Sequence, residues 1–458
     1  MKNVFHTLLF LCSFTLAAAS PAGDSSFLVQ SIDVGYPIIA LDYNPNGTLL
    51  AVGGGNKTVD IYQPSLGIKT KTFEGHDDDI LAIRFSPDNR LLATGGVDKK
   101  IIIWDVATET NIMEMRDHTD YVRDLAWSPD GRFLASASWD GTAIIWEAGT
   151  GRAVHKFKHE DNVTSVAFDP QGNKLITACG DHKLYLWDVK KGIRLYAFDG
   201  HTDEIWDVKW SPGSNLAASG GWDNKARIWN VGERKQVMEF PGHVTDVWSV
   251  AFSPEGIILA TSGGDRTIKL WDLSTGNIMV ELAKGVHTSD VEEVAFNPDG
   301  ETLVSCGRDG FLHFWEVPDM DERFASAIDI ALEKWSEKSP YEKTSAYEKR
   351  MAKKEKKAAE IRKEMEEKLS NFYERNVNWD VKFKVGDYNA DLEYFVVQSP
   401  SLGNLRLIVK PSEAPLVAEN VERLELRDLD IDVINGNLVV KEVTGYIKGL
   451  NRRYKIKP

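Results

Sequence analysis

The sequence predicts an all-β seven-bladed β-propeller, followed by a helical connector and a small α+β domain. One observation behind this prediction is a unit of roughly 42 residues that recurs along the first two-thirds of the 458-residue chain, because fixed periods of this length are typical of solenoids and propellers. A second is the pattern within each unit, where short apolar-alternating runs are separated by turn residues, as in antiparallel strands. A third is an abrupt change in composition at residue 319, because residues 319–370 contain no glycine and are dominated by Glu, Lys and Ala.

Residues 200–230, GHTDEIWDVKWSPGSNLAASGGWDNKARIWN, show the unit most clearly. A His opens the unit and a Trp closes it, with a hydroxyl residue and an Asp at fixed positions between them. Six units keep these residue types in register, with the His residues 42, 41, 42, 42 and 44 positions apart and the Trp residues at the same spacings. The six sets are His76, Thr94, Asp98 and Trp104; His118, Ser136, Asp140 and Trp146; His159, Thr177, Asp181 and Trp187; His201, Ser219, Asp223 and Trp229; His243, Thr261, Asp265 and Trp271; and His287, Ser305, Asp309 and Trp315.

These four residue types predict a buried hydrogen-bond chain in each unit. The Asp accepts from the His ring, the His bonds the hydroxyl, and the hydroxyl accepts the indole N–H of the Trp. Buried polar groups need such partners, and a fully satisfied network fixes one geometry. Because each set belongs to a different blade, the six sets stand around a ring and do not converge on one point. We therefore interpret them as structural, and expect no catalytic residue, no metal site and no cofactor.

A seventh, divergent unit precedes the six. Tyr62 takes the place of the Trp, Asn56 that of the Asp and Val52 that of the hydroxyl, and no His stands at the equivalent position. This unit lacks the polar chain, so we expect it to form the softest blade.

At these positions the chain resembles the WD40-repeat family. The residues that carry the resemblance are Gly-His pairs such as Gly75-His76 and Trp-Asp pairs such as Trp104-Asp105, over approximately residues 26–318. The resemblance implies a seven-bladed ring whose last blade takes its outer strand from the N-terminus. Residues 26–33 alternate as a lone strand and are the expected donor. Closure by that strand would remove the exposed edges of the ring.

The rest of the chain divides into three further segments. Residues 1–19, with Lys2, an apolar run and Ala17-Ala18-Ala19, have the layout of a secretory signal peptide, which predicts export to the periplasm or cell exterior. After the propeller (residues 24–318) we expect a connector over 319–371, with helices 321–338 and 341–372, and an α+β domain over 372–458. These last two segments resemble an appendage of bacterial secreted WD-repeat proteins, a likeness that implies no activity.

Charge and motifs exclude several functions. The formal net charge of −15 lies entirely before residue 319. A net-negative surface opposes non-specific binding to nucleic acid, but it tolerates a basic partner. No nucleotide-binding loop, serine nucleophile motif or paired-cysteine metal site is visible. No apolar run beyond the signal peptide is long enough to span a membrane.

The resemblance also implies which residues face the upper mouth of the ring, namely those at the start of each innermost strand and those just before each turn Asp. Trp, Tyr and Arg at such positions are the types that dominate binding hot spots. Acidic neighbours would suit a peptide with apolar and basic side chains. Trp127 and Trp210 stand instead where other units carry Phe, and are expected in the core. The candidate binding residues are Tyr121, Arg123, Trp139, Glu204, Trp206, Trp222, Asp246, Trp248 and Arg308.

The sequence therefore predicts a non-catalytic extracytoplasmic scaffold that binds a protein or peptide on a Trp-rich propeller face. Two alternatives stay open. One is a carbohydrate-binding protein in which indole rings stack on sugars. The other is an enzyme with a site in the C-terminal domain, where Asp387, Asp391 and Asp428 form no recognisable arrangement.

Overall fold

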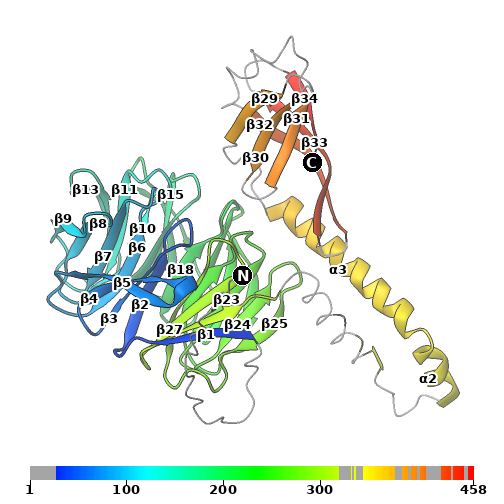
Figure 1. Ribbon diagram of the computed structural model, residues 1–458, viewed down its shortest axis with the longest axis horizontal. Helices are drawn as coiled ribbons and strands as arrows, with labels where there is room; N and C mark the ends of the chain where they lie inside the picture. Colours follow the sequence, from blue (N-terminus) through cyan, green and yellow to red (C-terminus); the bar gives the residue numbers. More distant parts are fainter. Residues whose placement is uncertain are drawn as a thin grey trace, which may run out of the picture.

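The computed structural model describes residues 27–318, 328, 332, 335–336 and 344–376, together with six strands between residues 384 and 457. Its main body is a ring of seven four-stranded antiparallel sheets, which confirms the predicted propeller (Figure 1). The predicted signal peptide lies outside the described residues.

Each of the first six blades is built from four consecutive strands, innermost first. Blade 1 contains β2 (Ile38–Tyr43), β3 (Leu50–Gly54), β4 (Thr58–Gln63) and β5 (Ile68–Glu74), and blade 2 contains β6 (Ile80–Phe85), β7 (Leu91–Gly96), β8 (Ile101–Asp105) and β9 (Thr110–Met115). Blade 3 contains β10 (Val122–Trp127), β11 (Phe133–Ser138), β12 (Thr142–Glu147) and β13 (Arg152–Lys158), and blade 4 contains β14 (Val163–Phe168), β15 (Lys174–Cys179), β16 (Leu184–Asp188) and β17 (Ile193–Phe198). Blade 5 contains β18 (Ile205–Trp210), β19 (Leu216–Gly221), β20 (Lys225–Asn230) and β21 (Lys235–Pro241), and blade 6 contains β22 (Val247–Phe252), β23 (Ile258–Gly263), β24 (Ile268–Asp272) and β25 (Asn277–Leu282).

Blade 7 closes the ring with a strand from the other end of the propeller. It consists of β26 (Val291–Phe296), β27 (Thr302–Gly307), β28 (Phe311–Glu316) and the N-terminal β1 (Leu28–Asp33). β1 pairs antiparallel with β28, from Leu28 opposite Trp315 to Asp33 opposite Phe311. The closing strand predicted from residues 26–33 is therefore confirmed.

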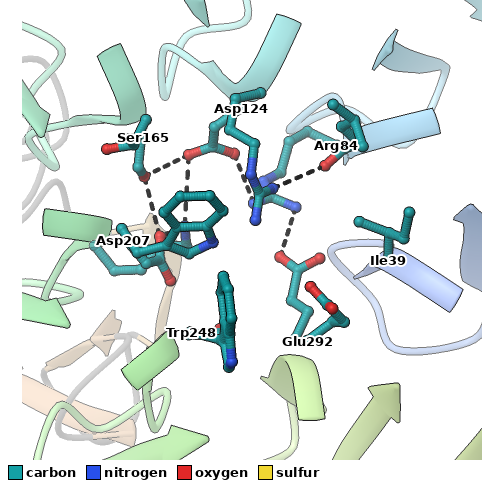
Figure 2. Close-up of a pocket in the computed structure, with 14 residues that line it drawn as sticks. Ile39, Arg84, Asp124, Ser165, Asp207, Trp248 and Glu292 are labelled. Atoms are coloured by element: carbon teal, nitrogen blue, oxygen red, sulfur yellow. Dashed lines mark hydrogen bonds and ion pairs between the residues drawn. The ribbon is translucent and has the colours of Figure 1, made fainter. Parts of the chain in front are cut away.

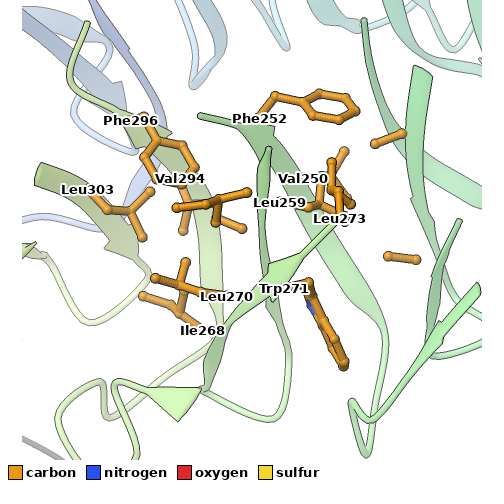
Figure 3. Packing of buried hydrophobic residues seen from close by; sticks show 14 of the residues in the cluster. Val250, Phe252, Leu259, Ile268, Leu270, Trp271, Leu273, Val294, Phe296 and Leu303 are labelled. Atoms are coloured by element: carbon orange, nitrogen blue, oxygen red, sulfur yellow. The ribbon is translucent and has the colours of Figure 1, made fainter. Parts of the chain in front are cut away.

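Apolar side chains of neighbouring sheets interlock between the blades. Between blades 6 and 7, Ile268 and Leu270 pack in the same cluster as Val294 and Leu303, and all four are almost fully buried (Figure 3). Burying one such side chain contributes about 1.5–3 kcal/mol. Successive side chains of a strand point to opposite faces of its sheet. Each blade packs between two neighbours, so both faces of a blade contribute buried side chains.

The predicted polar chain is complete in five blades. In blade 5, His201 contacts Asp223 at 3.0 Å and Ser219 at 2.7 Å, and Trp229 donates to Ser219 at 2.8 Å. Blades 2, 3, 6 and 7 repeat this arrangement.

Blade 4 departs from the expectation. His159 contacts Thr177 at 2.8 Å and Trp187 donates to Thr177 at 3.1 Å, but Asp181 accepts the hydroxyl of Tyr185 instead of bonding the His. Nδ1 of His159 is therefore buried with no partner. Burial, in the absence of that carboxylate bond, lowers the pKa of His159 to about 4.

Blade 1 lacks the histidine chain, as expected, but it has a different polar core. The buried carboxylate of Asp60 accepts from the Tyr36 hydroxyl at 2.9 Å and from the Thr72 hydroxyl at 2.7 Å. Greater softness of this blade stays a prediction.

Two helices follow the propeller, α2 (Thr344–Met351) and α3 (Lys354–Asn376). The single helix predicted over 341–372 is therefore wrong at Ala352 and Lys353, where the chain forms a turn. The N–H of Lys353 bonds the carbonyl of Arg350 at 2.9 Å, one residue short of the α-helical partner. Lysines at 353, 356 and 357 place like charges three and four positions apart, a spacing that weakens a helix. Most residues of the helix predicted over 321–338 lie outside the part of the chain that the structure describes.

The C-terminal region contains one antiparallel sheet in the order β29-β30-β31-β34-β33-β32. Its strands are β29 (Lys384–Asn389), β30 (Tyr394–Ser399), β31 (Gly403–Ile408), β32 (Leu424–Ile434), β33 (Asn437–Ile447) and β34 (Arg452–Lys457). Across the described residues, no helix combines the length and apolarity that a membrane span requires.

Candidate binding site at the upper mouth of the propeller

The inner strands of all seven blades begin at one end of the central channel, here called the upper mouth. A pocket of about 170 Å³ opens there. Six of the nine predicted binding residues line it, and Ile39, Leu81, Val97 and Glu292 complete the wall. The six are Tyr121, Arg123, Trp139, Trp206, Trp248 and Arg308.

Four tryptophans form one continuous aromatic cluster at this mouth. We call Trp139, Trp206, Trp222 and Trp248 the tryptophan cluster. The ring of Trp206 stacks on Trp222 with centroids 5.2 Å apart and meets Trp248 edge-on at 4.9 Å. Trp139 lies 6.4 Å from Trp206, also edge-on, and Tyr121 extends the cluster 5.1 Å from Trp139. Offset-stacked and edge-on pairs of this kind contribute about 0.5–1.5 kcal/mol each beyond their burial.

A glycine makes room for one of the four rings. Gly264 occupies the position before the turn Asp in blade 6, where blades 3 and 5 carry Trp139 and Trp222. A Cβ atom at Gly264 would lie 3.1 Å from Nε1 of Trp248 and 3.0 Å from Oγ1 of Thr245. Trp248, on the innermost strand β22 of the same blade, therefore packs closely over this turn, where a side chain would crowd its indole.

The indole N–H groups of the cluster have no hydrogen-bond partners. Nε1 of Trp139, Trp206, Trp222 and Trp248 is buried and unpaired in each case. The closing tryptophans of the blades, in contrast, all donate to a Ser or Thr, as Trp104 does to Thr94 at 2.9 Å. A buried donor without an acceptor costs about 1–3 kcal/mol. Four such groups linked through Trp206 distinguish this cluster from ordinary packing.

Two arginines reach the same pocket. Arg123 lies over the ring of Trp206, with Cζ 4.9 Å from the centroid, and donates to the Leu81 carbonyl at 3.3 Å. Arg308 pairs through Nε with the buried carboxylate of Glu292, and its side chain is 57% exposed. The pocket thus combines an aromatic wall with two guanidinium groups.

Glu204 and Asp246, the remaining acidic candidates, lie at the rim and do not line the pocket. Their backbone carbonyls accept from the N–H groups of Trp222 and Gly264, at 2.8 and 3.1 Å. Partial burial raises the pKa of both carboxyls, and neighbouring carboxylates add to the shift, Asp161 for Glu204 and Asp203 for Asp246. The rim therefore carries closely spaced negative charge.

Below the pocket a chain of buried ion pairs fills the channel (Figure 2). Lys209 contacts Asp207 at 2.5 Å and Asp124 at 3.6 Å. Arg84 contacts Asp124 at 2.8 Å and Glu293 at 3.0 Å. The free space among these groups is about 20 Å³, which is room for about one water molecule.

The same carboxylates join adjacent blades. The N–H of Val166 donates to Asp124, that of Val250 to Asp207 and that of Leu41 to Glu293, at 3.2, 2.9 and 2.8 Å. Sequence reasoning missed this chain. The sequence nevertheless contains a signal for the ion-pair chain. When the repeats are aligned, charged and hydroxyl residues recur at alternate positions of the innermost strands.

A second pocket of about 460 Å³ lies at the lower end of the channel. Trp127 and Trp210, expected in the core, are partly buried against core clusters and also line this pocket. Their indoles donate to the carbonyls of Arg84 and Ser214 at 3.0 and 2.9 Å. Asp42 also faces this pocket and accepts the N–H of Phe85 at 2.7 Å. Burial raises the pKa of the Asp42 carboxyl to about 7, against the opposing effect of Arg84.

One group of side chains has the composition of a metal site. Within the described part of the chain, His287, Asp309 and His313 place possible ligand atoms within 4.8 Å of one another. Both ring nitrogens of His287 are already engaged, by Asp309 at 2.9 Å and Ser305 at 2.8 Å. His313, which has no evident partner in the sequence, bonds Ser31 of the closing strand at 2.8 Å. The group therefore fits the polar chain of blade 7 and its link to β1.

Two of the three residues considered for a C-terminal active site lie on strands that the structure describes. Asp387 lies on β29 and Asp428 on β32, the first strand and the last in the sheet order. Asp391 lies outside the described residues.

Comparison with known families agrees with this geometry. A family model described as "IFT122 first beta-propeller" matches residues 37–237. The model described as "WD domain, G-beta repeat" matches residues 234–272 and 282–316. No curated protein matches the chain. The chain belongs to the WD40-repeat β-propeller family, whose propellers generally bind protein partners and are typically non-catalytic scaffolds.

Proposed function

We propose that this protein is a non-catalytic interaction scaffold that binds a protein or peptide segment at its upper mouth. The observation that carries the proposal is the tryptophan cluster, in which four indoles have unpaired N–H groups and three of them, Trp139, Trp206 and Trp248, line an open pocket. A polar group buried without a partner in a native structure calls for a specific explanation. An extended peptide supplies one, because its backbone carbonyls accept hydrogen bonds and its apolar side chains fill an aromatic pocket.

The charges around the pocket favour a segment with basic residues at its ends. Glu204 and Asp246 lie on the rim, where the ammonium or guanidinium of a partner would relieve the repulsion between carboxylates. Electrostatic complementarity of this kind speeds association and selects partners more than it adds affinity. The aromatic cluster would supply most of the binding energy, since buried Trp, Tyr and Arg dominate hot spots.

A sugar ligand is the alternative, and one feature counts against it. Stacking needs an open indole face, but Arg123 and Trp222 already cover the ring of Trp206. Trp139 and Trp248 meet that ring edge-on.

The test is crosslinking and pull-down with wild type and the double variant Trp206→Ala/Trp248→Ala. Truncating two hot-spot residues is expected to cost at least about 2 kcal/mol, or roughly 30-fold in affinity, so partners should be lost. Trp210→Phe at the lower pocket is the matched control, and circular dichroism verifies folding. A folded double variant that retains every partner would show that the upper mouth is not the binding surface. Glycan-array binding that disappears with the same variant would favour the sugar alternative.

The proposal includes a location outside the cytoplasm, supported by the signal-peptide pattern of residues 1–19. Intact-mass analysis of the protein recovered from fractionated cells tests it. A mature chain that starts after Ala19 in the exported fraction agrees with the proposal, and an uncleaved chain in the cytosol contradicts it.

A further inference from the structure

We propose that the group which enters the upper pocket is a carboxylate, carried by an acidic side chain or by the C-terminus of the partner. This inference rests on the proposed function and specifies the chemistry of the same site. It follows from the hydrogen-bond donors, the acceptors and the charged groups that line the pocket.

The pocket is rich in donors and poor in acceptors. Three indoles whose N–H groups have no partner, those of Trp139, Trp206 and Trp248, line it together with two guanidinium groups, whereas the only lining carboxylate among the described residues, Glu292, is already paired with Arg308. Indole and guanidinium groups donate and do not accept. A complementary ligand must therefore bring acceptors.

The pocket also holds an unbalanced positive charge. Arg123 is half-buried against Trp206, and no carboxylate pairs with it among the residues that the structure describes. Arg308 is neutralised by Glu292, so the two arginines and one glutamate leave one net positive charge. One carboxylate would neutralise it, and Arg binds carboxylates with two parallel hydrogen bonds.

A cationic ligand fits less well. An aromatic pocket attracts cations through the faces of its rings, but Arg123 already occupies the position over Trp206. A second cation would lie beside both arginines.

A doubly charged anion such as a phosphate monoester is disfavoured by the groups beneath the pocket. The buried chain below contains three carboxylates, Asp124, Asp207 and Glu293, for two cations, Arg84 and Lys209. Repulsion from this excess negative charge grows with the charge of the ligand. The acidic rim adds to it, so a single carboxylate flanked by basic or apolar residues is the best match.

Titration with matched probes tests the inference. The peptides are acetyl-Lys-Phe-Glu-Phe-Lys-amide, the same peptide with Gln or phosphoserine in place of Glu, and acetyl-Lys-Phe-Lys-Phe with either a free or an amidated C-terminus. Binding is followed by the indole N–H signals in ¹H–¹⁵N correlation spectra of the full-length protein. The Trp139, Trp206, Trp222 and Trp248 signals are assigned by single Trp→Phe variants.

We expect the Glu peptide or the free-carboxylate peptide to bind at least tenfold more tightly than its neutral counterpart. Which of the two does so identifies the source of the carboxylate. Signals of the cluster should move, and those of closing tryptophans such as Trp104 should not. Arg123→Gln should abolish the preference, whereas Arg132→Gln, an exposed arginine beside Phe133, should retain it.

Equal binding of charged and neutral peptides, tighter binding of the phosphoserine peptide, or no binding by any probe would overturn the inference. None of these outcomes touches the proposed function, because that is judged separately by the Trp206→Ala/Trp248→Ala pull-down.

Discussion

Substituting Asp42 by Asn should make the propeller more stable above neutral pH. The carboxyl faces the lower pocket, and burial raises its pKa to about 7 from an ordinary value of 3.8. In the folded protein it therefore holds its proton more tightly than in the unfolded chain. The stability that it contributes is complete below pH 3.8 and is lost as the pH rises to about 7.

The size of the effect follows from the two pKa values. At 1.36 kcal/mol per pKa unit, the difference corresponds to about 4 kcal/mol as an upper bound. Asn keeps the oxygen that accepts the Phe85 N–H but has no charge to bury. The variant and wild type should thus be equally stable near pH 4, and Asp42→Asn should be more stable by up to this amount at pH 8.

Urea unfolding of both proteins at several pH values between 4 and 8 measures this difference. Comparing the two at each pH cancels the contributions of titrating groups that do not interact with Asp42, such as His159. A stability difference that does not change with pH, or wild type being more stable at pH 8, would refute the reasoning.

Three further predictions concern the blades and the mouth. Ser219→Ala should lower the free energy of unfolding by about 2–4 kcal/mol, because His201 and Trp229 both lose their partner. The control Ser262→Ala should change it little, since the buried Ser262 hydroxyl has no partner. Urea unfolding measures both variants. Deleting β1 (Leu28–Asp33) should open blade 7 and lower the free energy of unfolding by at least about 3 kcal/mol through lost packing. The loss should appear as a lower thermal midpoint and faster proteolysis. An unchanged midpoint would contradict the role of β1 in closing the ring. Gly264→Val should displace Trp248 and weaken partner binding at least about tenfold in pull-down titrations, while Gly149→Ala, where a Cβ meets nothing within 4 Å, should leave binding intact.

The repeat could be predicted from the sequence because its signals are local and periodic. The residues of each polar chain stand at fixed offsets within one unit, and Trp229 or His201 needs no knowledge of other blades to be recognised. The resemblance to the WD40 family, carried over position by position along the repeat, implied which residues face the upper mouth, and the structure places Trp206 and Trp248 in one pocket there.

What the sequence did not reveal depends on neighbours from other strands or blades. Tyr185 competes for Asp181 because it lies four residues further along the next strand, a position filled by Ile102 and Ile144 in blades 2 and 3. The ion pairs between blades join residues far apart in the chain, such as Arg84 with Asp124 and with Glu293. The absence of partners for the cluster indoles is visible only once the atoms are placed.

The central claim is that the tryptophan cluster is the surface that binds a partner. The most direct measurement is the indole region of a ¹H–¹⁵N correlation spectrum, recorded with and without a captured partner. Acceptors from the partner should move the signals of Trp139, Trp206, Trp222 and Trp248 and leave the closing tryptophans in place. A stable complex in which those four signals do not change would contradict the account.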